Sequence, residues 1–181
     1  MLGTPFSPRC PDNNYVHSQV NATHTIVTGG EIGNSISDVC FYNWEDQSWQ
    51  RGPSIKTKRR LHDCIGISNN RVMVTGGYGL SGEGLTSVEI YDPELKPGGD
   101  WYQVQDLPEA DEYFKETTLQ FNSQIFWIRK THIWKFVSNN VSEYEWLMFT
   151  NELDDSPNSP LTMLVPNDFF PSKQIENEEN L

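Results

Sequence analysis

The sequence predicts an all-β fold made of repeated, antiparallel four-stranded sheets, and two observations support this. The first is an internal repeat, in which a Gly-Gly doublet begins at Gly29 and again 47 residues later at Gly76. A tryptophan follows in the same order, at Trp49 and again 52 residues later at Trp101. The second observation is a series of short apolar or alternating runs bounded by polar turns, which is typical of β-strands. Self-similarity at such a period indicates a repeat architecture.

Each repeat contains four strand-like runs. In the second repeat, the Asn-rich segment 68–70 is a turn of the kind that joins two strands of a hairpin. The runs of this repeat are 64–67, 71–75, 88–91 and 101–105. The first repeat matches at 15–20, 24–28, 37–42 and 47–50, and a third, less regular repeat matches at 117–121, 124–128, 132–137 and 144–148.

An apolar strand that ends in Gly-Gly, followed by a tyrosine such as Tyr42 or Tyr91 and then by a tryptophan, resembles the kelch repeat family. The resemblance implies a kelch-type β-propeller whose blades are the four-stranded units 15–53, 59–108 and 113–150. In the third unit Arg129 and Lys130 occupy the place of the glycine doublet, so the tightness of that turn does not follow from the pattern. One further apolar strand, 161–165, could begin a fourth blade or close a ring.

The number of repeats predicts an incomplete or open propeller, because propellers typically contain about four to eight blades. An open arc would expose the flat faces of its end blades to water, and such faces favour association. Three explanations stay open: a fragment of a longer protein, which we favour, self-association through the end blades, or closure as an unusually small ring. Residues 1–14 are expected to form an irregular leader and residues 171–181 a disordered acidic tail.

Composition and charge restrict the class of protein. Apolar residues make up 36% of the chain, and no apolar run approaches the roughly 18 residues that a membrane span needs. The net charge of −12 argues against binding to nucleic acid, which depends on clustered cations. Three cysteines favour a reducing, cytoplasmic location over an extracellular one. Glycosylation sequons at Asn21 and Asn140 keep an extracellular location open.

No catalytic, metal or cofactor site is predicted. Cys40 and Cys64 would lie on different blades, beyond the reach of a disulfide, and are expected to be buried thiols. The chain has no Cys-x-x-Cys or His-Glu-x-x-His motif. Its glycine-rich segments precede strands, whereas a phosphate site needs a helix N-terminus after the glycines. We therefore expect a non-enzymatic protein without a cofactor.

A protein-binding surface is the positive hypothesis. The segment 56–60 carries four cations in five positions, so Arg59 and Arg60 could form an electropositive site for an acidic peptide, or the segment could be an ordinary solvated loop. Tyr78, on a Gly-flanked loop with Ser81 and Glu83 nearby, is a candidate contact residue, although it could equally pack within the framework.

The kelch resemblance also implies where these candidates lie. In that family the loops after the second strand and the segments that join blades share one face, which here are 31–36, 78–86, 54–60 and 109–112. The Arg60-Leu-His62 segment matches a family pattern that leads into a first strand, so His62 is expected to belong to the framework. Two alternatives stay open: a secreted propeller that binds a glycan or another ligand, and a truncated fragment with no independent function.

Overall fold

In the part of the chain that the structure describes, three antiparallel four-stranded sheets follow one another along the sequence. A computed structural model describes residues 13–33, 36–110, 117–129, 132–138 and 144–150. The predicted strand 161–165, the tail 171–181 and all of the leader except residues 13–14 lie outside these ranges. Among the described residues, no helix has the length and apolar character needed to cross a membrane.

Each sheet is a meander, in which every strand pairs with the strand that follows it in sequence. The first sheet contains β1 (Val16–Gln19), β2 (His24–Thr28), β3 (Val39–Asn43) and β4 (Ser48–Arg51). The second contains β5 (Asp63–Ile67), β6 (Arg71–Thr75), β7 (Val88–Asp92) and β8 (Asp100–Gln103). The third contains β9 (Thr117–Phe121), β10 (Gln124–Arg129), β11 (His132–Ser138) and β12 (Tyr144–Thr150). The strands predicted within the three repeats are therefore confirmed, with ends that differ by at most two residues.

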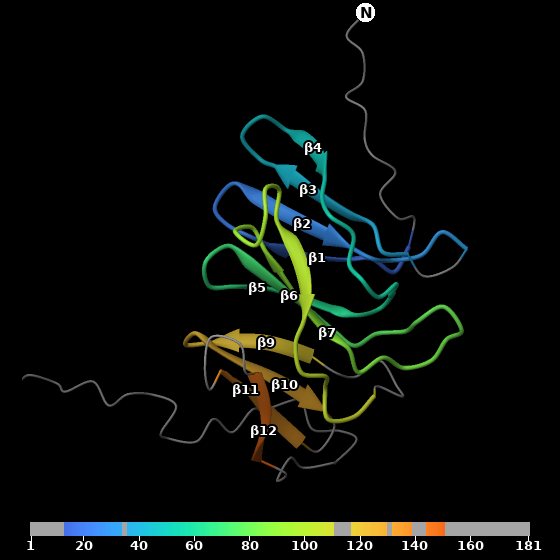
Figure 1. Cartoon of the computed structure of the whole chain (residues 1–181), viewed down its shortest axis with the longest axis vertical. Coiled ribbons are helices and arrows are strands. Elements are labelled where there is room, and N and C mark those ends of the chain that lie inside the picture. Colours follow the sequence, from blue (N-terminus) through green and yellow to red (C-terminus); the bar gives the residue numbers. More distant parts are fainter. Residues whose placement is uncertain (1–12, 34–35, 111–116, 130–131, 139–143, 151–181) are drawn as a thin grey trace, which may run out of the picture.

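The three sheets, called here the first, second and third blades, lie one above another in Figure 1. Their first strands are neighbours, since β1 contacts β5 and β5 contacts β9. In each blade the later strands follow outward from the first strand. This is the arrangement of a propeller, and the described residues form an incomplete one, as the sequence predicts.

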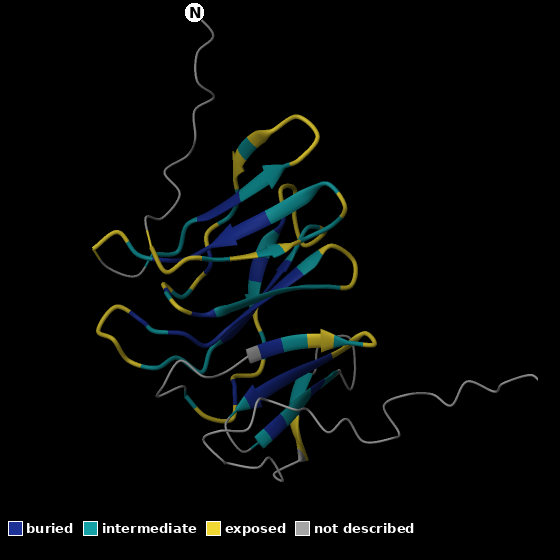
Figure 2. Ribbon diagram, turned by 180° about the vertical axis from the view of Figure 1, so that it is seen from behind, coloured by how far each residue is buried: buried dark blue, intermediate teal, exposed yellow. Residues whose placement is uncertain are grey.

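Most of the hydrophobic core lies between the blades, and a smaller cluster of Phe126, Ile128 and Ile133 belongs to the third blade alone. Dark blue residues in Figure 2 mark the sheet interiors, where neighbouring blades bury their faces against each other. Burial of apolar surface contributes about 25 cal/mol per Å², so each blade is stabilised mainly by its neighbour. The first interface consists of Ile26, Val39, Ile55, Val72, Val74, Tyr91 and Trp101. The second consists of Met73, Val88, Ile90, Leu107, Ile125, Trp127, Phe136 and Trp146.

The repeated tyrosine and tryptophan pack in the same way in the first two blades. The ring centroids of Tyr42 and Trp49 are 4.9 Å apart, and those of Tyr91 and Trp101 are 5.6 Å apart, both at 52°. Trp101 is completely buried against the first blade, and its indole donates a hydrogen bond to the Pro53 carbonyl at 2.8 Å. Trp49 is only half-buried, since no described blade covers that side of the first blade.

The glycine doublets are required for two physical reasons. Gly29 and Gly76 both adopt left-handed backbone conformations, with φ of 57° and 58°, which favour glycine. A Cβ atom on Gly29 would lie 2.5 Å from the Arg59 carbonyl oxygen, so the chain that enters the next blade passes directly over the doublet. In the third blade Arg129 occupies the equivalent place, and its guanidinium bonds the Ala110 carbonyl at 3.0 Å.

The predicted hairpin turns and free thiols are also present. Asn69 and Asn70 both have positive φ, as the two central residues of a type I′ turn require. Cys40 and Cys64 are free, as expected. Cys40 is buried as expected, whereas Cys64 is only half-buried, although desolvation still raises the pKa of its thiol to about 12.

A candidate protein-binding surface formed by loops

Four segments meet at one end of the first two blades. They are residues 13–14, the β2–β3 loop, the β4–β5 linker and the β6–β7 loop, and both interstrand loops project to the right in Figure 1. The β1–β2, β5–β6 and β3–β4 hairpins project to the opposite side. We call the first set the loop face, and its outward residues are Asn14, Glu31, Ile32, Lys58, Arg60, Leu61, Tyr78, Leu80, Ser81 and Glu83.

Backbone hydrogen bonds connect the β4–β5 linker with both loops. The Arg60 N–H donates to the Tyr78 carbonyl at 3.0 Å, and the Tyr78 N–H donates to the Arg60 carbonyl at 2.9 Å. One residue earlier, the Arg59 carbonyl accepts a bond of 2.9 Å from the Gly30 N–H. The linker therefore holds the loops of the first and second blades at fixed positions relative to each other.

Residues 13–14 are bound to the same surface. The Glu31 N–H donates to the Asn13 carbonyl at 2.9 Å, and the Leu61 N–H donates to the Asn14 carbonyl at 3.1 Å. These two residues end the predicted irregular leader, and they are hydrogen-bonded to a loop and to the linker. All four segments of the loop face are thus joined by main-chain hydrogen bonds.

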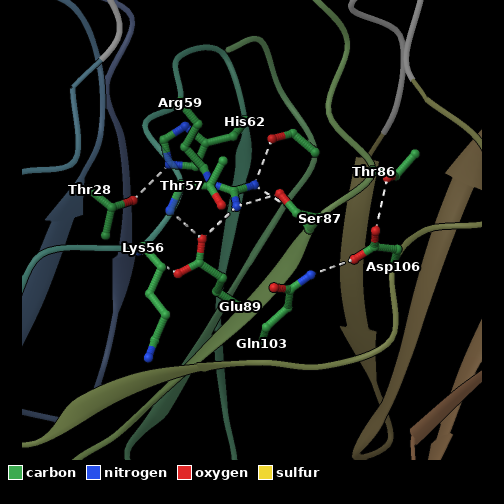
Figure 3. Close-up of polar contacts among 11 residues, drawn as sticks. Thr28, Lys56, Thr57, Arg59, His62, Thr86, Ser87, Glu89, Gln103 and Asp106 are labelled. Atoms are coloured by element: carbon green, nitrogen blue, oxygen red, sulfur yellow. Dashed lines mark hydrogen bonds and ion pairs between the residues drawn. The ribbon is translucent and has the colours of Figure 1, made fainter. Parts of the chain in front are cut away.

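Arg59 lies beneath the loop face and not on it. Its side chain has no exposed surface, so the prediction that Arg59 contacts a partner is wrong in this structure. Figure 3 shows the guanidinium pointing inward at the Glu89 carboxylate, which Arg59 Nη2 contacts at 2.8 Å. Nη1 donates to the carbonyls of Gly76 at 2.8 Å and Ser87 at 2.9 Å. Arg59 therefore fastens the linker to β7 and to both ends of the β6–β7 loop.

Glu89 completes this buried network from the second blade. Its carboxylate oxygens accept hydrogen bonds from the backbone N–H groups of Lys56, at 2.7 Å, and Thr57, at 2.9 Å. Burial lowers the pKa of Arg59, an effect that the Glu89 charge opposes, and a guanidinium stays protonated in proteins. The two residues form a completely buried ion pair that draws the linker onto the second blade.

His62 belongs to the framework, as expected. It is buried, and its Nε2 atom is hydrogen-bonded to the Thr28 hydroxyl of the first blade at 2.9 Å. Burial, together with the charge of Arg59, holds the pKa of His62 well below its ordinary value of 6.5. The residue is therefore neutral at physiological pH and connects the start of β5 to the end of β2.

The predicted electropositive site is reduced in the structure. Arg60 is partly exposed, but its Nε atom forms an ion pair with Glu31 at 3.2 Å. Lys56 is exposed. Hydrogen bonds from Lys96 and Trp101 lower the pKa of Asp100 at the start of β8, and the charge of Lys56 adds a smaller effect in the same direction. Of the predicted cations, only Lys58 and Arg60, which is paired with Glu31, lie at the loop face. Binding of an acidic peptide to them stays a prediction.

Tyr78, Ser81 and Glu83 do lie on the loop face, as predicted. Ser81 and Glu83 are exposed and Tyr78 is half-buried. The Ser81 N–H donates to the Glu83 carboxylate at 2.8 Å, and the Gly79 N–H donates to the Glu83 carbonyl at 3.0 Å. The loop is therefore a compact turn closed by its own hydrogen bonds. Contact of these three residues with a partner stays a prediction.

Sequence reasoning missed three apolar residues on this face. Ile32, Leu61 and Leu80 are 45%, 38% and 52% exposed. Each is a large apolar residue within a segment that is otherwise mostly polar or glycine-rich, and this contrast is the signal that could have identified it. The fourth segment expected on this face, 109–112, is described only to residue 110, where Glu109 forms an ion pair with Arg129.

The described residues contain no group of three or more His, Cys, Asp or Glu side chains arranged to hold a metal ion. Asn21, in the first sequon, caps the β1–β2 turn, where its side-chain oxygen accepts hydrogen bonds from the Thr23 and His24 N–H groups. Asn140 lies outside the described ranges. Glycosylation of either asparagine is untested.

Comparisons with known proteins agree with the repeat pattern. No protein-family model matches the chain. A curated F-box/kelch-repeat protein of Arabidopsis thaliana is 40% identical over 58 residues, which is 32% of this chain and 15% of that protein. The solved structure of YjhT superposes with a TM-score of 0.61 at 13% identity, over 80% of this chain and 52% of YjhT. Neither protein is matched over two thirds of its own length.

The Arabidopsis protein is named for its kelch repeats, and YjhT shares the fold of this chain. Together with the Gly-Gly, Tyr and Trp landmarks at equivalent places in two blades, they identify the described residues as three blades of a kelch-type β-propeller.

Proposed function

We propose that this chain contributes a non-enzymatic protein-binding surface and that the partner contacts the loop face. The observation that carries the proposal is the set of main-chain hydrogen bonds that joins residues 13–14, both interstrand loops and the linker. Loops held on a rigid scaffold bind at low entropic cost, because they are already ordered before the partner arrives.

The chemistry of the loop face supports binding more than catalysis. Its outward residues are apolar, polar or charged, and the imidazole beneath them, that of His62, is buried and hydrogen-bonded to Thr28. A catalytic base must reach its substrate, and a group in this position does not. The name of the Arabidopsis relative includes an F-box, but the match covers only 15% of that protein, so we transfer no activity of the whole relative.

The test compares the wild-type chain with one loop-face variant and one matched control as baits for proteins from the organism that makes it. Tyr78→Ser with Leu80→Ser alters the loop face. Leu95→Ser is the control, since Leu95 is 53% exposed on the β7–β8 hairpin and Leu80 is 52% exposed. Captured proteins are then purified, and their Kd values for all three baits are measured by calorimetry.

We expect at least one purified partner that binds wild type and Leu95→Ser equally and binds the loop-face variant at least about tenfold more weakly, a difference of about 1.4 kcal/mol. Thermal melting of the three baits shows whether the folded state is intact. A partner that loses affinity only for Leu95→Ser would place the binding surface on the hairpin side. If every captured protein binds the three baits equally, the loop face is not the binding surface.

A further inference from the structure

The loop face presents apolar side chains from three separate segments. Ile32 follows Glu31 in the β2–β3 loop, Leu61 follows Arg60 in the linker, and Leu80 lies in the β6–β7 loop. Arg60 joins the three segments, because its side chain pairs with Glu31 and its backbone pairs with Tyr78. A single exposed leucine is ordinary on a protein surface, whereas several gathered on one face indicate an interaction site.

The backbone at Leu61 is a second, independent observation. Its φ is 52°, a left-handed conformation that is rare for a bulky residue other than glycine. The strained conformation is held by the hydrogen bond to the Asn14 carbonyl, and the side chain is left 38% exposed. Strained residues of this kind concentrate at binding and active sites.

Charges on the loop face nearly cancel, although the whole chain carries −12. Arg59 is neutralised beneath the surface by Glu89, and Arg60 is neutralised at the surface by Glu31. Lys58 and Glu83 contribute one charge of each sign. Such a surface has little net field with which to attract an acidic or a basic partner.

We propose that the partner of the loop face binds through aliphatic or aromatic side chains of a short segment, which contact Ile32, Leu61 and Leu80. This inference rests on the proposed function and specifies the chemistry of its partner. Apolar anchors in the centre of an interface, surrounded by a polar rim, provide most of the binding energy in such contacts. Here the Glu31–Arg60 pair, Ser81 and Glu83 supply that rim.

The probe is a phage-displayed library of random peptides, selected on the intact chain. Selected peptides are synthesised and their affinities measured for wild type, Leu61→Gly, Leu80→Ser and the control Leu95→Ser. Leu61→Gly deletes the side chain while it relieves the strained backbone, because glycine adopts positive φ readily. The variant is therefore expected to stay folded, and thermal melting verifies this before affinities are compared.

We expect the selected peptides to be rich in Leu, Ile, Phe, Trp or Tyr and to bind Leu61→Gly and Leu80→Ser at least about tenfold more weakly. Affinity for Leu95→Ser should be unchanged, and raising the salt from about 50 to about 300 mM should have little effect on Kd. The inference would be overturned if the selected peptides are acidic, bind weakly at high salt, and lose affinity for Lys58→Ala but not for Leu61→Gly or Leu80→Ser. The proposed function would still stand in that case. A selection that yields no peptide sensitive to any loop-face substitution would overturn both.

Discussion

Two adjacent arginines of the β4–β5 linker should differ strongly in their contribution to stability. Arg59 is completely buried and pairs with Glu89, which is 1% exposed, whereas the Arg60 and Glu31 side chains are 26% and 30% exposed. Removal of one partner from a buried ion pair leaves a charge without compensation and typically costs about 3–5 kcal/mol. An exposed pair contributes about 0–1 kcal/mol.

Arg59→Met should therefore lower the free energy of unfolding by about 3–5 kcal/mol, and Arg60→Met by about 1 kcal/mol or less. Since a domain of this size is stable by roughly 5–15 kcal/mol in total, the first change removes a large part of the stability. The measurement is urea unfolding followed by tryptophan fluorescence, to which the buried Trp101 contributes. Equal losses for the two variants would refute the assignment of Arg59 to the buried framework.

Glu89→Leu and the double variant Arg59→Met/Glu89→Leu complete a double-mutant cycle. Replacement of both charges removes the uncompensated one, so the double variant should be more stable than the sum of the single losses predicts. Recovery should be incomplete, because the Lys56 and Thr57 N–H groups and the Gly76 and Ser87 carbonyls lose buried hydrogen-bond partners. Strict additivity would show that the two side chains do not interact.

Three further predictions concern single side chains of the blades. Trp101→Ala should destabilise the protein by about 3–5 kcal/mol and Trp49→Ala by less, because Trp101 is completely buried and Trp49 is not; equal losses in urea unfolding would contradict this packing. His62 has a pKa in the folded state below its unfolded value of 6.5, so below that pH the unfolded chain binds a proton that the folded chain does not. The free energy of unfolding should therefore fall as the pH drops below about 6.5, by up to about 1.4 kcal/mol per pH unit, and His62→Gln should remove this slope; an unchanged slope would be evidence against a buried neutral imidazole. The Cys64 thiol, whose pKa burial raises to about 12, should resist labelling by a thiol reagent at about pH 8 until the protein is unfolded in urea, and rapid labelling of the native protein would show that it is accessible.

The strands could be predicted from the sequence because their signals are local. Val88 and Ile90 alternate with Glu89 and Tyr91 along β7, which is a strand signal. Asn69 and Asn70 supply the positive φ values of a hairpin turn. The landmarks of the repeat then give the order of the sheets. The strand and turn signals depend on residues within a few positions of one another, and the repeat landmarks recur at a nearly constant period of about 50 residues.

The different roles of Arg59 and Arg60 could not be predicted in the same way. The two residues have identical chemistry and adjacent positions, and only the course of the linker over the second blade directs one inward and the other outward. Arg59 meets Glu89 across 30 residues of sequence. The sequence of β7 did contain a signal for a buried charge, because Glu89 stands between Val88 and Ile90, which are both buried. A buried charge requires a partner, and Arg59 was available to supply it.

This arrangement determines how binding experiments on the loop face must be designed. Arg59 touches both ends of the β6–β7 loop through the Gly76 and Ser87 carbonyls, and its own carbonyl bonds Gly30 of the β2–β3 loop. Charge reversal at Arg59 would release these loops and abolish binding without the residue ever contacting a partner. Arg60→Glu would place two carboxylates beside each other at Glu31, but it would leave the buried network in place. A loss of affinity therefore identifies a contact residue only when it occurs for surface changes such as Leu80→Ser or Lys58→Ala, at an unchanged free energy of unfolding.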